Sequence, residues 1–482
     1  PPGYAWAYLR FVRDPSPSPP PDPLSPQRGE RPGEGGQPEN PDDSAPSPPQ
    51  SPWRPAAGTF PGWPAAAAAL TVLDPCCGSG HFLTEALTAL AALRRAEEGL
   101  SPGEAVAAVL RDNLAGLEID GRCVQIAAFN LALTGWRIGG AGTALPTPNV
   151  AWVGAPPPLP KAEFAALANG DAELRRGLEA LHDLFAGAPL LGSLIEPVGG
   201  DLANPRRVAR IEDSIAALVE RMRGAEPERA AGVVAARGMA DAAAILSRRW
   251  VLQVTNVPFL GRGRQVNALR AHLSGHFEAA KADLATAMLL RMLALSSPAG
   301  TIAAVMPQYW LFLSQYEDTR DKVLSDTQMN MTAKLGSGAF ETISGEVVRV
   351  CLFVTSNTRR NDSEFSVVDV TRDSGCPEKS CALQSSNLTV LGQQNQFKNP
   401  DMIIGYYSDR QSELLEKFAY SYQGLATSDN SQFVLNFWEV AFIGNGWELF
   451  QMAPEGGAQI SGCSWILHWA LIYVLDLAGG TG

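Results

Sequence analysis

Short apolar runs alternate with longer stretches of helical apolar spacing through the middle of the chain. One apolar run ends at Asp74, and residues 83–95 after it have the spacing of a helix. Ser101 and Pro102 predict the start of a second helix over 101–113, because serine caps helices and proline fits their first turn. The other predicted strands are 115–120, 250–255, 300–306 and 347–354, the other predicted helices are 124–132 and 279–295, and 146–160 is a predicted loop. This alternation predicts an α/β fold with a doubly wound parallel sheet.

Changes in composition divide the chain into four predicted regions. Residues 1–13 form an aromatic N-terminal remnant, and 14–64 are so rich in Pro, Ser and Gly that we expect them to be disordered. Residues 65–355 form the α/β domain, with helical insertions over about 155–249. The polar residues 356–482 are expected to form a partial, truncated second domain.

The chain is acidic, with a formal net charge of −12 over 482 residues. This charge argues against a protein that coats nucleic acid, although contact with DNA requires only a local basic face. Seven arginines could form such a face or could be ordinary solvated side chains: Arg206, Arg207, Arg210, Arg248, Arg249, Arg262 and Arg264.

The seven cysteines predict neither a disulfide framework nor a zinc site. Cys376 and Cys381 lack a second pair that would complete a zinc site, so we expect reduced thiols and no bound metal. The longest apolar run, 465–477, is too short to cross a membrane. These features predict a cytoplasmic protein without a membrane partner.

The segment Asp74-Pro-Cys-Cys-Gly-Ser-Gly-His-Phe-Leu83 predicts a tight turn between a strand and a helix. Gly78 and Gly80 allow the backbone to approach a ligand, and the helix start offers free N–H groups. Glu118 ends the next predicted strand, where its carboxylate can accept both hydroxyls of a ribose. The spacing favours S-adenosylmethionine over NAD because Gly-x-Gly-x-x-Gly is absent, as is a P-loop. A structural turn without a ligand is the remaining alternative.

A second segment, Asn256-Val-Pro-Phe259, follows the predicted strand 250–255. Methylation of an exocyclic amine is difficult because the nitrogen lone pair is delocalised into the ring. The Asn256 side-chain oxygen and the Val257 carbonyl can each accept one amine N–H, which frees the lone pair. Phe259 can stack on a base that is held outside the double helix. Taken alone, the tetrapeptide would also suit an ordinary turn.

Several segments together resemble the N6-adenine DNA methyltransferases of phage-exclusion (BREX-type) systems and the methylase part of single-chain restriction-modification enzymes. They are 74–83, 113–120, 122–133 and 256–264, with further similarity at 345–350, 422–429 and 437–439. The resemblance covers about 62–469.

This resemblance implies a Rossmann-like, class I S-adenosylmethionine-dependent methyltransferase domain followed by a partial C-terminal recognition domain. It also implies methyl transfer to a flipped adenine of double-stranded DNA, and association with other subunits of a phage-defence system. The implied cofactor-binding residues are Asp74, Gly78, Gly80 and Glu118, the implied catalytic residues are Asn256, Pro258 and Phe259, and Asp283 and 192–194 are further candidates for the pocket.

The chain departs from the family pattern at Val257, where the family usually has proline. Pro258 already keeps Val257 extended, so the expected loss is a fixed φ, on the order of 0.5–1 kcal/mol. We expect reduced rather than abolished activity. The alternatives are a non-catalytic DNA-binding or assembly subunit with a decayed site, or methylation of cytosine N4 or a protein glutamine. No nuclease constellation is visible, so restriction is not predicted.

Overall fold

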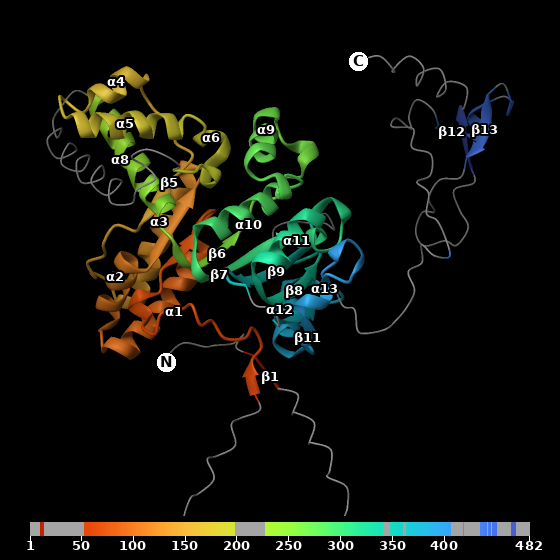
Figure 1. The fold of residues 1–482 in the computed structure, drawn as a ribbon, viewed down its shortest axis with the longest axis horizontal. Coiled ribbons are helices and arrows are strands. Elements are labelled where there is room, and N and C mark those ends of the chain that lie inside the picture. The colour runs from red at the N-terminus through yellow and green to blue at the C-terminus, as the bar shows by residue number, and fades with distance from the viewer. Residues whose placement is uncertain are drawn as a thin grey trace, which may run out of the picture. The chain divides into compact units, whose positions relative to one another are not determined.

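The computed structural model describes residues 10–13, 53–197, 227–340, 348–359, 363–405, 418, 434–440, 442–444, 446–450 and 464–468. The chain divides into two compact units, Pro1–Tyr406 and Tyr407–Gly482. The first contains a nine-stranded mixed sheet and the second a three-stranded sheet. The mixed α/β character predicted from the sequence is confirmed for the first unit (Figure 1).

Nine strands form the large sheet. They are β3 (Val72–Asp74), β4 (Leu114–Glu118), β5 (Val150–Trp152), β6 (Trp250–Asn256), β7 (Ser296–Pro307), β8 (Gln328–Gly336), β9 (Val350–Ser356), β10 (Glu364–Asp369) and β11 (Thr389–Gly392). Their order across the sheet is β11-β10-β8-β9-β7-β6-β3-β4-β5, and β3 to β7 are parallel. The chain order reverses between β3 and β6, and open α/β sheets bind ligands at the carboxyl ends of strands beside such a reversal.

The other half of the sheet is mixed in direction. β9 is antiparallel to both β7 and β8, β10 is parallel to β8, and β11 is antiparallel to β10. Because β10 and β11 extend the same sheet, the domain boundary predicted at 355/356 is wrong, and the first unit continues to Tyr406. A polar composition misled the prediction, since edge strands of this kind need only one apolar face.

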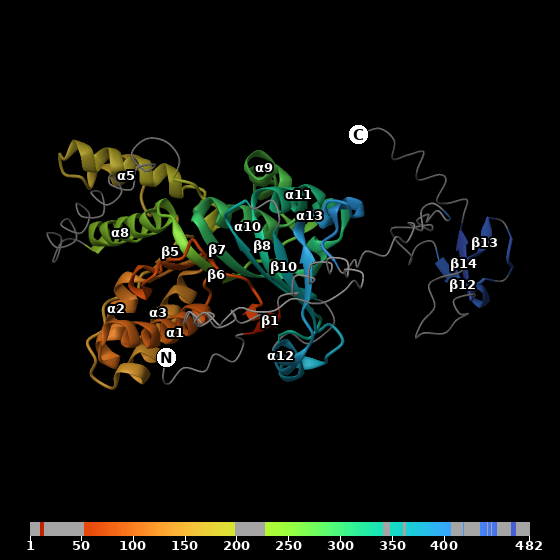
Figure 2. The ribbon, with the colours of Figure 1, turned by 60° about the horizontal axis from the view of Figure 1, so that its bottom comes forward.

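Helices cover both faces of the parallel half (Figure 2). On one face lie α1 (His81–Glu98), α2 (Pro102–Asp112) and α3 (Gly121–Gly139), and on the other lie α4 (Lys161–Ala166), α5 (Ala172–Phe185), α6 (Ala188–Leu191) and α8 (Pro227–Ser247). Val72 packs with Leu87 of α1, whereas its neighbour Leu73 packs with Phe164 and Phe185. Successive side chains of a strand point to opposite faces, so the two residues join separate cores.

Helix α2 begins where the sequence predicts. The Ser101 hydroxyl accepts from the backbone N–H of Glu104, and the Glu104 carboxylate accepts from the backbone N–H of Ser101. This capping box satisfies two N–H groups that would otherwise lack partners at the helix start.

Over the mixed half of the sheet, α9 (Asn267–His276), α10 (Leu284–Leu295) and α11 (Glu317–Asp326) cover one face, and α12 (Gly375–Ser385) lies against the other (Figure 2). The short helix α13 (Gln393–Gln396) follows β11. The largest apolar cluster on the helical side combines Met288 of α10, Val323 of α11 and Ile302 of β7. This packing fixes the start of α10 close to the end of β6.

A paired N-terminal segment also packs on the first unit. β1 (Phe11–Arg13) is antiparallel to β2 (Trp53–Pro55). The Ser366 hydroxyl of β10 donates to the Ala56 carbonyl, and the Trp63 indole N–H donates to the Thr301 hydroxyl over 2.9 Å. Residues 53–64 therefore differ from the predicted disorder, because the Ala56 backbone and the Trp63 side chain have partners distant in sequence. Residues 14–52 lie outside the described residues.

Four strands of the large sheet, β5, β8, β10 and β11, were not predicted from the sequence. β5 lies inside the predicted loop 146–160, where a three-residue strand between prolines is too short to show periodicity. β8 was not predicted at all, although it is almost wholly buried. The part of the predicted helical insertion at 198–226 lies outside the residues described.

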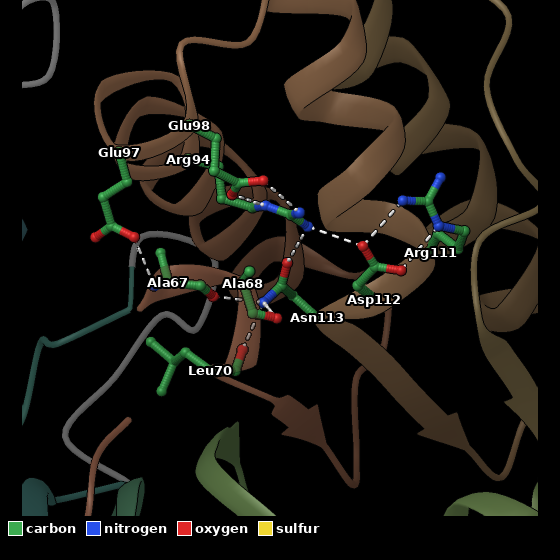
Figure 3. A network of polar contacts seen from close by, with 9 residues as sticks. All are labelled: Ala67, Ala68, Leu70, Arg94, Glu97, Glu98, Arg111, Asp112 and Asn113. Atoms are coloured by element: carbon green, nitrogen blue, oxygen red, sulfur yellow. Dashed lines mark hydrogen bonds and ion pairs between the residues drawn. The ribbon is translucent and has the colours of Figure 1, made fainter. Parts of the chain in front are cut away.

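A polar network fastens the ends of β3 and β4 that lie away from the carboxyl edge (Figure 3). The buried Arg94 guanidinium forms ion pairs with Glu98 at 2.6 Å and Asp112 at 2.9 Å, and donates to the Asn113 side chain. Asn113 in turn donates to the carbonyl of Leu70, just before β3, over 2.8 Å. The network joins α1, α2 and the starts of β3 and β4, so it fixes the two strands whose carboxyl ends carry the site loops.

The second unit is described only in part. It contains β12 (Val434–Asn436), β13 (Trp447–Phe450) and β14 (Trp465–His468), in the order β12-β14-β13 with antiparallel pairing. Within the described ranges of the whole chain, no helix combines the length and apolar character needed to span a membrane.

Candidate active site at the carboxyl edge of the sheet

Asp74 is the last residue of β3 and is almost completely buried. One carboxylate oxygen, Oδ1, accepts from the backbone N–H of Cys76 over 3.1 Å. The other, Oδ2, is buried without a hydrogen bond of ordinary length among the described residues, although the Thr255 hydroxyl lies near enough to stabilise the carboxylate. Burial raises the pKa of Asp74 from 3.8 to about 7. A buried carboxylate oxygen without such a bond at a strand end is suited to a ligand that donates hydrogen bonds or carries positive charge.

The glycine loop after Asp74 is held by its backbone. The N–H of Cys77 donates to the Leu117 carbonyl of β4, and the N–H of Gly80 donates to the Cys77 carbonyl. Gly78 and Gly80 have φ values of +53° and +83°, which side chains other than glycine rarely adopt. The two glycines differ in surroundings, because a Cβ on Gly80 would lie 3.0 Å from the Ala127 Cβ, whereas a Cβ on Gly78 would meet nothing within 4 Å. Gly80 is therefore required by packing, and Gly78 faces open space.

Glu118 ends β4 beside this loop and is 9% exposed. Its Oε2 accepts from the N–H of Gly78 over 2.8 Å, and its Oε1 accepts from the N–H of Asp120 over 3.0 Å. Each carboxylate oxygen has two lone pairs, so these bonds leave capacity for two further donors. Glu118 thus fixes the glycine loop and can still accept the hydroxyls of a ribose.

The segment 192–194 lies against the same loop. The buried Ser193 hydroxyl donates to the Pro75 carbonyl over 2.6 Å, and a Cβ on Gly192 would lie 3.2 Å from the Ile119 Cδ1. Ile119 is 45% exposed, directly after the end of β4. This arrangement brings an apolar side chain to the carboxyl edge, where sequence reasoning had identified 192–194 but not Ile119.

Arg291 of α10 holds this segment in place. Its guanidinium donates to the Ser193 carbonyl over 3.0 Å and to the Ile195 carbonyl over 2.8 Å, and pairs with Glu196. Burial lowers the pKa of Arg291 to about 10. This role was not predicted from the sequence, because an arginine in an apolar helix has no local partner that reveals it.

The loop after β6 carries the predicted catalytic residues. Asn256, the last residue of β6, is exposed, Val257 is 2% exposed, Pro258 is exposed and Phe259 is half-buried. β6 lies next to β3, with Leu73 opposite Gln253, so both loops leave the same edge of the sheet from neighbouring strands. The structure therefore places the asparagine oxygen and the glycine loop on one edge.

Asp283 anchors the loop after β6, which carries the predicted catalytic residues and is called the catalytic loop below. Its Oδ1 accepts from the N–H of Leu260 over 3.2 Å and from the N–H of Ala285 over 2.9 Å, which makes Asp283 the N-cap of α10. The sequence analysis placed Asp283 within a helix over 279–295, whereas the helix begins after it. Asp283 is fully buried, its Oδ2 makes no hydrogen bond of ordinary length among the described residues, and burial raises its pKa while the Tyr309 hydroxyl opposes the rise. Its role in the structure is to fix the loop.

A cavity of about 630 Å³ opens beside the catalytic loop. Phe259 lines it together with Tyr309, Gln315 and Val348, and its remaining lining comes from Leu260, Gly261, Arg262, Gly263, Arg264, Glu278, Ala279, Lys281, Ala282 and Asp318. Burial raises the pKa of Tyr309, so its hydroxyl is neutral near pH 7 and can donate a hydrogen bond. The cavity combines aromatic walls with charged side chains.

The cysteines near the glycine loop are thiols that resist ionisation. Burial, followed by the negative charge of Asp74, raises the pKa of both Cys76 and Cys77. A reactive cysteine requires a lowered pKa, so neither thiol has the properties of a nucleophile. Within the described part of the chain, no three His, Cys, Asp or Glu side chains are grouped so that they could hold a metal ion.

The chain is similar to two curated adenine-specific methyltransferases. It is 28% identical over 396 residues to PglX of Lacticaseibacillus casei (strain Zhang), covering 78% of this chain and 32% of PglX. It is 29% identical over 379 residues to BrxX of Escherichia coli O9:H4 (strain HS), covering 70% of this chain and 30% of BrxX. The resemblance inferred from the motifs is confirmed, and the chain spans about a third of the length of these relatives.

No family model matches the chain. Among solved structures, the type IIL restriction-modification enzyme MmeI in complex with DNA is similar with a TM-score of 0.41 and 14% identity, over 77% of this chain and 41% of that chain. A nuclease-deletion mutant of the type ISP enzyme LlaGI is similar with a TM-score of 0.40 and 13% identity, over 67% of this chain and 24% of that chain.

Proposed function

We propose that this chain carries the methyltransferase part of an enzyme that transfers a methyl group from S-adenosylmethionine to adenine N6 in DNA. The observation that carries the proposal is the pairing of two loops at one sheet edge. The glycine loop with Asp74 follows β3, and the loop with Asn256 follows the neighbouring strand β6. The similarity to adenine-specific methyltransferases supports the same reaction.

The strand order supports a Rossmann-like, class I methyltransferase fold. In chain order, the five parallel strands are arranged third, second, first, fourth and fifth across the sheet. This is the order of the first five strands in the doubly wound nucleotide-binding fold, with the ligand crevice beside the first strand. Here the first strand is β3, which ends in Asp74.

The residues at the glycine loop fit S-adenosylmethionine. Asp74 offers a buried oxygen without a hydrogen bond of ordinary length, Glu118 has two free lone-pair positions, and Gly78 faces open space that a side chain would fill. When bound, the cofactor supplies an electrophilic methyl group. Asp74 and Glu118 would orient it, and the N-terminal N–H groups of α1 would lie near its carboxylate.

The catalytic loop would prepare the target amine. Asn256 is exposed at the end of β6, where its side-chain oxygen can accept one N–H of adenine N6. The carbonyl of Val257 would accept the other N–H, and the Phe259 ring would stack on the flipped base. Asp283 holds the backbone of Leu260 and so keeps these acceptors in place. No general base is required if the proton leaves to water after the transfer.

The second unit would contribute to target recognition. We propose that the sheet of β12, β13 and β14 belongs to a domain that recognises double-stranded DNA. Association with further phage-defence subunits is part of the same proposal, and rests on the resemblance of the methyltransferase motifs.

Calorimetry of S-adenosylmethionine binding tests the cofactor site. Gly78→Val and Glu118→Ala should each abolish measurable binding, by filling the ligand space and by removing the ribose acceptor. Gly99→Val is the matched control, because Gly99 has a φ of +71° and equally open space but lies at the far end of α1. Binding that survives in both site variants would place the cofactor elsewhere.

Mapping of adenine methylation across the genome, with and without the gene, tests the reaction. New N6-methyladenine at one sequence would support the proposal. If the purified protein binds S-adenosylmethionine but genomes with and without the gene have the same adenine methylation, a non-catalytic assembly subunit or another amine substrate becomes the better interpretation.

A further inference from the structure

The wall of the 630 Å³ cavity includes a short rigid turn with the sequence Gly261-Arg-Gly-Arg264. The N–H of Arg262 donates to the Ala282 carbonyl, and the N–H of Arg264 donates to the Gly261 carbonyl, both over 2.9 Å. A Cβ on Gly263 would meet nothing within 4 Å. The turn therefore presents two arginines and an open stretch of backbone directly after the catalytic loop.

The two arginines have charge that their neighbours do not neutralise. Three cationic side chains line the cavity, Arg262, Arg264 and Lys281, against the two anionic side chains of Glu278 and Asp318. Lys281 and Glu278 form an ion pair with each other. The remaining balance is two arginines to one aspartate, and no ion pair of either arginine occurs among the residues that the structure describes.

Arg262 also has an unsatisfied donor. Its Nη2 donates to the Ser274 hydroxyl over 3.2 Å, which fixes the side chain, while its Nη1 is buried without a partner in the described part of the chain. A buried guanidinium N–H without an acceptor is costly. Arg264 and Tyr309 line the same cavity, and the positive charge of Arg264 partly opposes the rise that burial causes in the pKa of Tyr309. Both guanidinium groups thus lie at the cavity without an anionic partner.

We propose that Arg262 and Arg264 bind backbone phosphates of DNA next to the flipped target nucleotide. This inference rests on the proposed function and adds the residues that hold the DNA backbone at the site. Guanidinium groups match phosphate geometry, and the open backbone at Gly263 allows a sugar-phosphate chain to approach. In a chain of net charge −12, a local cationic turn also offsets the general repulsion of DNA.

The proposal predicts a specific change in salt dependence. Each phosphate neutralised by a protein cation contributes about 0.9 to the slope of log K against log salt concentration on B-DNA. Arg262→Gln and Arg264→Gln should therefore each lower the magnitude of the slope by about 0.9, and the double variant by about 1.8. A contact that specifies sequence would weaken binding to one target without this uniform change.

The measurement uses the full chain and a mixed-sequence duplex with one adenine opposite an abasic site, which lowers the cost of flipping. Binding is titrated by fluorescence anisotropy over a series of salt concentrations. Arg248→Gln is the matched control, because Arg248 lies just before β6, at the opposite end of the strand, with its guanidinium 4.7 Å from the Trp250 ring centre. Arg262→Lys keeps the positive charge and should retain most of the slope. S-adenosylmethionine binding should be unchanged in every variant, which confirms that each one folds.

The outcomes separate this inference from the proposed function. Slopes lowered in the two glutamine variants but not in Arg248→Gln support the phosphate site. DNA binding with the same slope in all variants overturns the phosphate site and leaves the methyltransferase proposal standing. If the unaltered chain binds S-adenosylmethionine but shows no salt-dependent DNA binding, the phosphate site and the DNA substrate are both rejected.

Discussion

The two loops of the site are each anchored by a carboxylate, but the two carboxylates differ in how many of their oxygens make hydrogen bonds. Each carboxylate accepts one backbone N–H from the loop and another from the residue two positions after itself. Glu118 uses one oxygen for Gly78 and the other for Asp120. Both of its oxygens are engaged, and the residue is only 9% exposed. Glu118 therefore fixes the glycine loop with both of its own oxygens satisfied.

Asp283 anchors the catalytic loop with only one of its two carboxylate oxygens. A single oxygen, Oδ1, accepts from both Leu260 and Ala285, and the fully buried Oδ2 makes no hydrogen bond of ordinary length among the described residues. Burial accordingly raises the pKa of this carboxyl group. The comparison teaches that both loops depend on carboxyl groups distant in sequence, 40 positions apart for Glu118 and Gly78 and 23 for Asp283 and Leu260, but that Glu118 anchors its loop with both oxygens and Asp283 with one.

The largest expected effect separates the two loops by function. Asn256→Ala should lower methyl transfer by roughly two to three orders of magnitude, as loss of one transition-state hydrogen-bonding group does elsewhere. S-adenosylmethionine binding should remain nearly intact, because the glycine loop does not depend on Asn256. Transfer of tritiated methyl groups to unmethylated DNA measures the first quantity, and calorimetry measures the second.

Asn267→Ala is the control, since Asn267 is an exposed asparagine at the first position of α9. Equal transfer by Asn256→Ala and Asn267→Ala would show that the loop after β6 does not handle the amine, and the functional division between the two loops would be lost.

Asp74→Asn should weaken S-adenosylmethionine binding and stabilise the folded protein above pH 7. The folded state raises the pKa of Asp74 from 3.8 to about 7, so it binds the proton more tightly than the unfolded chain does. Stability associated with Asp74 is therefore present at low pH and is lost as pH rises towards and through 7, by at most about 4 kcal/mol. Asparagine does not ionise and keeps the acceptor for Cys76, so the variant should unfold at higher urea concentration above pH 7 and bind S-adenosylmethionine more weakly.

The stability gain of Asp74→Asn should shrink as pH falls towards the unfolded pKa. Urea titrations of both proteins on either side of pH 7 measure this difference. A gain that is the same at every pH would show that Asp74 is not protonated in the folded protein, and that its charge is already compensated.

Asp283 offers the corresponding test on the catalytic side. Asp283→Ala removes the cap of α10 and leaves the Leu260 N–H without an acceptor, at a cost of about 2 kcal/mol in unfolding free energy. Asp283→Asn retains the Oδ1 acceptor and should remain close to wild type in stability. Urea unfolding gives the stability, and single-turnover methyl transfer should fall in the alanine variant while cofactor binding persists. Stable, fully active Asp283→Ala protein would show that the loop is held by its own backbone.

This contrast explains which parts of the site the sequence could predict. The sequence predicts strands with clear apolar patterns that end at Asp74, just before Gly78, and near Glu118. Because the carboxyl ends of parallel strands lie at one edge of a sheet, their shared position could be predicted. The pairing of the loop after β6 with residues 282–284 joins segments whose contact has no local signal. Arg291 illustrates the same limit, since its carbonyl partners lie almost a hundred positions earlier in the chain.

The mixed half of the sheet was predicted less well for a similar reason. β10 pairs with β8 and β11 but not with β9, which precedes it in the chain, and its residues Glu364–Asp369 follow a polar stretch that resembles a linker. Burial of β10 depends on α12 and the N-terminal segment covering its face, which composition does not reveal. The sequence consequently separated residues 356–405 from a sheet to which they contribute two strands.

The smallest expected effect concerns Val257, the departure from the family pattern in the catalytic loop. Val257 is 2% exposed and packs in the same core as α10, so its side chain contributes to holding the loop that its carbonyl serves. Proline at this position would fix φ and reduce the freedom of the unfolded chain by about 0.5–1 kcal/mol. If that rigidity acts on the acceptor geometry, Val257→Pro should raise the single-turnover rate about two- to five-fold.

Val266→Pro is a matched control, because Val266 has a φ of −68°, compatible with proline, and lies outside the loop. A rise in the first variant alone would locate the effect in the catalytic loop. If wild type and Val257→Pro both bind S-adenosylmethionine and both fail to methylate DNA that they bind, backbone rigidity is not what limits the site, and an assembly subunit becomes the better interpretation.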